Sequence, residues 1–167
     1  MPYRNKTYVC FDGDNDMHYY RLMQAWHQSD YSTFRLYNAH DLNSARDTSQ
    51  EASIKRQLRE RLLNTKVFVV LIGGQTRYLY KFVRWEMEQA ISLNLPIIGV
   101  NLNGLRKQDP ERCPPVIRNV LAVYISFNSR ILEYALENWI NLHYQYQKQG
   151  KGGPFYYEPE TYQRLGL

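Results

Sequence analysis

Cysteine is scarce in this chain, and the residue patterns of several familiar kinds of site are missing. Only two of its 167 residues are cysteines, which excludes a disulfide framework as the means of stabilising the fold. Cysteine and histidine do not cluster at the spacing of zinc ligands. The chain has no Gly-x-Gly-x-x-Gly run and no Walker-type lysine, so side chains and scattered amides would have to hold any bound nucleotide.

Long apolar segments are missing as well. No stretch approaches the roughly 20 residues of a membrane span, and Met1–Lys6 lack the apolar region of a signal peptide. We therefore expect a soluble protein in the reducing cytoplasm. The net charge of +5 and the pI of about 9.2 suit an anionic ligand such as a dinucleotide. Because the basic residues are spread over helix surfaces, they give no reason to expect nucleic-acid or membrane binding.

Short apolar runs alternate along the chain with amphipathic helical patterns. The expected strands are Thr7–Phe11, Phe34–Tyr37, Val67–Ile72, Ile97–Val100 and Leu121–Ile125. The third and fourth are nearly continuous apolar runs, typical of strands covered on both faces. We expect an α/β protein of the flavodoxin-like doubly wound kind, with a five-stranded parallel sheet and helices on both faces. Residues 1–146 should form this domain, and residues 147–167 should form an irregular C-terminal extension.

A glutamate lies in the middle of an apolar helix face. The helix expected over Leu79–Leu93 places its apolar residues on one side, at about 100° per residue. Glu86 points into the centre of that side, and Glu88 points away from it. A core-facing carboxylate costs several kcal/mol unless it is paired, hydrogen-bonded or lines a cavity. Glu86 is therefore predicted to face a pocket. The open alternative is a structural glutamate held by a buried arginine or by backbone amides.

Polar loops follow the expected strands at the edge of the sheet where doubly wound proteins bind their ligands. These loops are Asp12–Asp16, Asn38–Ser49, Gly73–Tyr78 and Asn101–Asn103. In the first loop, Asp16 is expected to cap a helix and the other acids to hydrogen-bond the loop. This explanation suits Asp12 least, because it lies nearest the strand end. In the long second loop, His40 and Arg46 could contact phosphates or ribose hydroxyls, and a merely solvated His40 is the alternative.

The acidic loop and the strand ends partly match the patterns of three other kinds of site. A calcium loop would need glycine at Met17 and glutamate at Met23. A haloacid-dehalogenase-type phosphatase could use Asp12 and Asp14, but it would need further acids after a later strand, where Asn101-Leu102-Asn103 stands. A response regulator would need an aspartate at the end of the third strand, which reads Leu71-Ile72-Gly73. No metal site is expected, and the phosphatase remains the weakest of the open alternatives.

Five segments, in this order, resemble the TIR-like family, and most closely its branch containing the TIR protein of the bacterial Thoeris anti-phage defence system. They are Phe11–Asp16, Asn38–Ser49, Val69–Gly73, Phe82–Glu86 and Ile97–Val100. The resemblance covers about residues 6–140. TIR enzymes often carry Trp-Cys-x-x-Glu on the helix after the third strand. This chain has Phe82 and Val83 in place of the tryptophan and cysteine, and Glu86 stays aligned with the glutamate.

The resemblance implies an NAD⁺ nucleosidase with Glu86 as its catalytic residue. Such an NAD⁺ glycohydrolase or ADP-ribosyl cyclase takes NAD⁺ as substrate, cleaves the nicotinamide–ribose bond and needs no cofactor. Its ADP-ribose-derived product would activate a separate effector protein, and self-association through TIR surfaces is expected. The residues expected to bind the substrate are Phe11, Asp12, Asp14, Asn38, His40, Arg46, Gln75 and Trp85. The alternative is a non-catalytic TIR-like interaction module.

Overall fold

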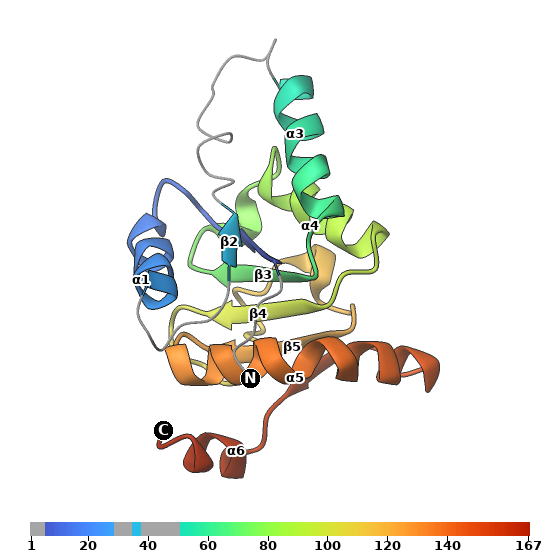
Figure 1. Ribbon diagram of the computed structural model, residues 1–167. Coiled ribbons are helices and arrows are strands. Elements are labelled where there is room, and N and C mark those ends of the chain that lie inside the picture. The colour runs from blue at the N-terminus through green and yellow to red at the C-terminus, as the bar shows by residue number, and fades with distance from the viewer. Residues whose placement is uncertain (1–5, 29–34, 38–50) are drawn as a thin grey trace.

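A parallel six-stranded sheet forms the centre of the fold (Figure 1), as seen in a computed structural model that describes residues 6–28, 35–37 and 51–167. The sheet order is β2-β1-β3-β4-β5-β6, and every neighbouring pair is parallel. The strands are β1 (Lys6–Cys10), β2 (Arg35–Tyr37), β3 (Val67–Ile72), β4 (Ile97–Asn101), β5 (Ala122–Ser126) and β6 (Pro154–Tyr156). The first five strands begin and end within one residue of the predicted bounds. The doubly wound parallel α/β fold is confirmed.

Helices cover both faces of the sheet, because successive strand residues point to opposite sides. On one face, α1 (Met17–Gln28), α5 (Ser129–Lys148) and α6 (Pro159–Arg164) pack against a cluster that includes Val9, Val69 and Val123. On the other face, α3 (Glu51–Leu63), α4 (Val83–Ser92) and the 3₁₀ helix η3 (Pro115–Ile117) pack against a cluster that includes Tyr8, Cys10 and Val70. Within the described ranges, no helix has the length and apolar character to cross a membrane.

The C-terminal segment is ordered secondary structure, so the expectation of an irregular extension is wrong. Helix α5 runs on to Lys148, and β6 then pairs with β5 as a sixth strand. In Figure 1, the red chain after α5 leads to α6 at the C-terminus. Aromatic contacts hold the segment in place: Tyr146 and Phe155 stack with their ring centroids 4.6 Å apart, and Trp139 lies 5.9 Å from Phe155. The division of the chain at residue 146 stays a prediction.

Helix α4 begins four residues later than the apolar pattern indicated. The chain first makes a short 3₁₀ helix, η2 (Thr76–Tyr78), and Leu79 then adopts an extended conformation with φ −92° and ψ 91°. The Thr76 hydroxyl fixes this turn, because it accepts a hydrogen bond from the Gly73 amide at 2.9 Å and donates one to the Leu71 carbonyl at 3.3 Å. These two bonds tie η2 to the end of β3 and delay the start of the helix until Val83.

Candidate functional site

Glu86 is buried on the core-facing side of α4. It lies in the first turn of the helix and is 1% exposed. The side chain of Glu88 is 45% exposed and pairs with Arg84 at 3.0 Å. The predicted orientation of the two glutamates is therefore confirmed. Because the first turn of a helix carries a partial positive charge, this position also favours a carboxylate electrostatically.

Two side chains of β1 face the Glu86 carboxylate. Burial, followed by the nearby charge of Glu86, raises the pKa of the Tyr8 hydroxyl far above its usual value, and among the described residues this hydroxyl has no partner at hydrogen-bond geometry. Burial and the nearby charge of Glu86 also raise the pKa of the Cys10 thiol. Cys10 further approaches the first turn of α4, with Sγ 3.8 Å from the Val83 carbonyl oxygen. Both groups are thus held protonated beside a buried carboxylate.

Asp12 organises the loop that follows β1. It is 1% exposed. Its Oδ1 accepts hydrogen bonds from the amides of Asp14 at 3.0 Å and Asn15 at 3.3 Å, and its Oδ2 accepts one from Asn15 Nδ2 at 2.7 Å. Asp14 itself is exposed. Asp12 therefore stabilises its own loop through hydrogen bonds. Among the acids of this loop, the sequence made Asp12 the least expected to do so.

Asp16 bridges the ends of β1 and β3 and is 8% exposed. The described hydrogen bonds of its side chain include no helix cap, and its Oδ2 has no hydrogen-bond partner there. Burial and the neighbouring charge of Asp12 raise the pKa of the Asp16 carboxyl, while His18 and Arg112 oppose the shift. The expected capping role is thus not found. Asp16 instead places a buried carboxyl group at the point where the sheet order reverses between β1 and β3.

The other predicted substrate-binding residues are dispersed. Phe11 faces the α1 side of the sheet, opposite to Tyr8 and Cys10, and its ring stacks on Tyr20 at 4.6 Å. Trp85 is half-buried beside α3, with the Lys55 amine 5.5 Å from its ring centroid. Gln75 is exposed at the start of η2. Asn38, His40 and Arg46 lie outside the described residues. A shared cleft of Asp12 and Arg46 with Glu86 therefore stays a prediction.

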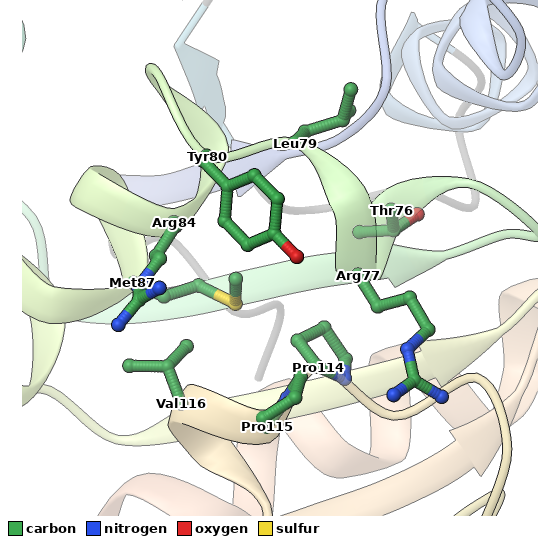
Figure 2. A pocket seen from close by; sticks show the side chains of 9 residues that line it. All are labelled: Thr76, Arg77, Leu79, Tyr80, Arg84, Met87, Pro114, Pro115 and Val116. Carbon is green, nitrogen blue, oxygen red and sulfur yellow. The ribbon is translucent and has the colours of Figure 1, made fainter.

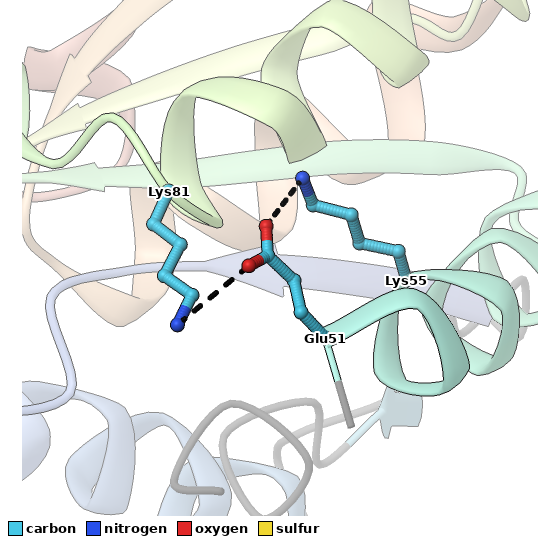
Figure 3. Close-up of polar contacts among 3 residues, drawn as sticks. All are labelled: Glu51, Lys55 and Lys81. Carbon is cyan, nitrogen blue, oxygen red and sulfur yellow. Dashed lines mark ion pairs between the residues drawn. The ribbon is translucent and has the colours of Figure 1, made fainter. Parts of the chain in front are cut away.

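Ion pairs connect the start of α3 to the turn before α4, on the Glu86 face of the sheet. Glu51, in the first turn of α3, pairs with Lys55 at 3.0 Å and with Lys81 at 3.8 Å (Figure 3). Hydrogen bonding to Lys55 is the main cause that lowers the pKa of Glu51. Since Lys81 lies just ahead of α4, the two ion pairs link the start of α3 to the turn that presents the α4 helix.

A cavity of about 210 Å³ lies along α4. Its only signal in the sequence is a pair of consecutive prolines, Pro114 and Pro115. Its lining residues are Thr76, Arg77, Leu79, Tyr80, Arg84, Met87, Pro114, Pro115 and Val116 (Figure 2). They come from η2, the turn that follows it, α4, and the segment from Pro114 into η3. The last of these segments meets the others only in the folded chain. Glu86 does not line this cavity. Across the described ranges, no group of three or more histidine, cysteine, aspartate or glutamate side chains could hold a metal ion.

The sheet order defines a doubly wound α/β protein of the flavodoxin-like or TIR-like kind. Residues 8–107 match the family described as Thoeris protein ThsB, TIR-like domain, and the chain belongs to this family. No curated protein matches the chain. One similar solved structure is the "Crystal structure of conserved protein from Enterococcus faecalis V583", with 18% identity, a TM-score of 0.46 and coverage of 98% of each chain.

Proposed function

We propose that this protein cleaves NAD⁺ at the nicotinamide–ribose bond and that Glu86 is its catalytic carboxylate. The observation that carries the proposal is the burial of Glu86 in the first turn of α4, in a chain of the ThsB TIR-like family. The resemblance to TIR enzymes aligns their catalytic glutamate with this position.

The chemistry of this bond suits a site with one carboxylate. Nicotinamide leaves NAD⁺ as a neutral base, so the reaction needs no general acid, unlike an ordinary glycoside hydrolysis with its two carboxyl groups. The remaining ribosyl group develops positive charge in the transition state. An ionised carboxylate held at that point stabilises the charge without moving, and it can also bind the ribose hydroxyls.

The 1% exposure of Glu86 adds a requirement to the proposal. Substrate can reach the carboxylate only when the groups that cover it move aside. Self-association through TIR surfaces would supply the energy for such a change, because binding shifts a conformational equilibrium toward the state that it favours. The rate per molecule should therefore rise with protein concentration.

The proposal also covers the nucleotide product and the effector protein that binds it. An ADP-ribose-derived nucleotide, cyclic or conjugated, would diffuse to a separate effector protein of the Thoeris defence system. This protein would then act as a producer of signal in anti-phage defence.

The test is mass spectrometry of nucleotides after the protein is incubated with NAD⁺ at low and at high protein concentration. Glu86→Gln keeps the shape of the side chain and removes its charge, so nicotinamide release should fall about a hundredfold or more, or on the order of 3 kcal/mol. Glu88→Gln is the matched control on the exposed side of the same helix and should keep the wild-type rate. A folded Glu86→Gln variant with wild-type turnover would exclude Glu86 as the catalytic residue.

A second function is favoured by the neighbours of Glu86. The Tyr8 and Cys10 groups that face its carboxylate would suit a structural glutamate in a non-catalytic interaction module. Two results together would support that function: a wild-type protein that releases no nicotinamide at any concentration, and self-association that persists in Glu86→Gln. Concentration-dependent release of nicotinamide would exclude it.

A further inference from the structure

The cavity along α4 combines an apolar base with a cationic rim. Its apolar surface comes from Leu79, Met87, Pro114, Pro115 and Val116. In Figure 2, the Arg77 and Arg84 side chains lie on opposite sides of the cavity-lining residues, with the Tyr80 ring between them in this view. Such a combination of apolar walls with a few convergent polar groups is typical of small-molecule sites.

The two arginines differ in how far their charge is already balanced. Arg84 pairs with Glu88 at 3.0 Å. Arg77 donates a hydrogen bond to the carbonyl oxygen of Glu111, which positions the guanidinium without neutralising it. In the described part of the chain, Arg77 has no carboxylate partner. A guanidinium that is fixed in place and still charged is suited to pairing with a phosphate or carboxylate.

An aromatic surface lies beside the two cations. The Tyr80 side chain is 64% exposed, and the Arg84 guanidinium lies 5.8 Å from its ring centroid. An exposed ring next to proline and methionine side chains offers stacking and sulfur contacts to a planar ligand. The cavity therefore contains the parts that recognise a ring together with the part that recognises a negative charge.

Size limits the ligand. A volume of about 210 Å³ falls below the roughly 300–1,000 Å³ of pockets that enclose drug-sized ligands. One ring with one anionic group fits this space, and a whole dinucleotide does not. We propose that this cavity is a binding site for a small aromatic anion, with Arg77 pairing the anionic group and the Tyr80, Met87 and Pro114 side chains holding the ring. This site is separate from Glu86 and does not rest on the proposed function.

Titration of the full chain followed by NMR tests the proposal with three probes. Phenyl phosphate carries both the ring and the charge, phenol carries the ring alone, and inorganic phosphate carries the charge alone. Phenyl phosphate should shift the methyl signals of Met87 and Val116 and bind at least about tenfold more tightly than either other probe, because it makes both kinds of contact. Binding no tighter than that of inorganic phosphate would overturn the proposal.

Two variants and one control locate the site. Arg77→Gln should weaken phenyl phosphate binding about tenfold, as expected for the loss of one hydrogen bond to a charged group. Val116→Trp should fill the cavity and abolish binding. Arg56→Gln removes the same charge from an exposed position on α3 and should leave binding unchanged. Equal weakening by Arg56→Gln, or wild-type binding by Arg77→Gln, would overturn the proposal whether or not Val116→Trp folds.

Discussion

The Asp16 carboxylate lies directly against the backbone of Gly73, so that a Cβ atom built on this glycine would be 2.2 Å from Asp16 Oδ2. Gly73 follows β3, and Asp16 ends the loop that follows β1. The contact therefore closes the gap between two loops at the point where the sheet order reverses. Only a residue without a side chain allows the two loops to approach this closely.

Gly73→Ala should destabilise the fold. The added methyl group would overlap the buried Asp16 carboxylate, and overpacking of this kind costs about 1–3 kcal/mol. Gly74→Ala is the matched control, because its Cβ would meet no atom closer than Arg112 Nη2 at 4.0 Å. Urea denaturation of both variants measures the difference. Equal free energies of unfolding for Gly73→Ala and Gly74→Ala would show that Asp16 can move aside without cost.

Asp16→Asn should stabilise the protein at neutral pH. Burial and Asp12 raise the pKa of Asp16 above its ordinary value of 3.8, so the folded state disfavours the ionised form. The resulting loss of stability is fully present above the folded pKa and disappears below the unfolded value. Asparagine removes the charge, so its benefit should be largest near pH 7 and vanish below about pH 3.8.

Thermal unfolding followed across this pH range checks the prediction for Asp16. Asp14→Asn makes the same change of charge on an exposed side chain of the same loop and serves as the control. An Asp16→Asn variant less stable than the wild type at pH 7 would contradict the expected sign and would indicate that the attraction to His18 and Arg112 outweighs the cost of burial.

Tyr8 and Glu86 should be coupled in the free energy of unfolding. The Tyr8 hydroxyl is held protonated near the buried charge of Glu86 without meeting it at hydrogen-bond geometry, so Tyr8→Phe should destabilise the wild type by about 1 kcal/mol. In the Glu86→Gln background the charge is gone, and the same substitution should cost clearly less. Denaturation of the wild type, both single variants and the double variant gives this coupling energy. Effects that add to within about 0.5 kcal/mol would show that the two groups do not interact.

The strands could be predicted from the sequence because their signal is local. Val67–Ile72 is a continuous apolar run, and all six of its residues are buried in β3. The sixth strand could not be found in this way. β6 has three residues, begins with Pro154 and is only partly buried. Its place depends on the stacking of Phe155 with Tyr146, which no periodic pattern in the sequence records.

In the candidate site, the sequence predicted only those side-chain orientations that follow from helix geometry alone. The 3.6-residue period was enough to turn Glu86 inward and Glu88 outward. The roles of Asp12 and Asp16 were not predictable, because they depend on how two loops meet: Asp16 contacts Gly73, which lies 57 positions further along the chain. The cavity along α4 could not be predicted for the same reason, because Pro114 and Pro115 line it from a distant segment of the chain.

NAD⁺ cleavage should proceed in the presence of EDTA. The oxygens of Asp12 are engaged in hydrogen bonds of its own loop, and β4 ends in Asn101, whose amide donates to the Leu105 and Lys107 carbonyls at 3.0 Å and 2.7 Å. In the described part of the chain, the end of β4 therefore adds no carboxylate to Asp12 and Asp16 at this edge of the sheet, and no group of three potential metal ligands forms. Because nicotinamide leaves as a neutral base, the charge of Glu86 is sufficient to stabilise the ribosyl cation.

The measurement is nicotinamide release with chelator, and again after Mg²⁺ or Mn²⁺ is added back. Unchanged release in EDTA is the expected result. Activity that vanished in chelator and returned only with one of these metals would reject the mechanism. It would then favour phosphatase-like chemistry with Asp12 as the nucleophile, and Asp12 would first have to give up its bonds to the amides of Asp14 and Asn15. Phosphate release from a phosphomonoester, lost in Asp12→Asn, would be the observation that establishes that chemistry.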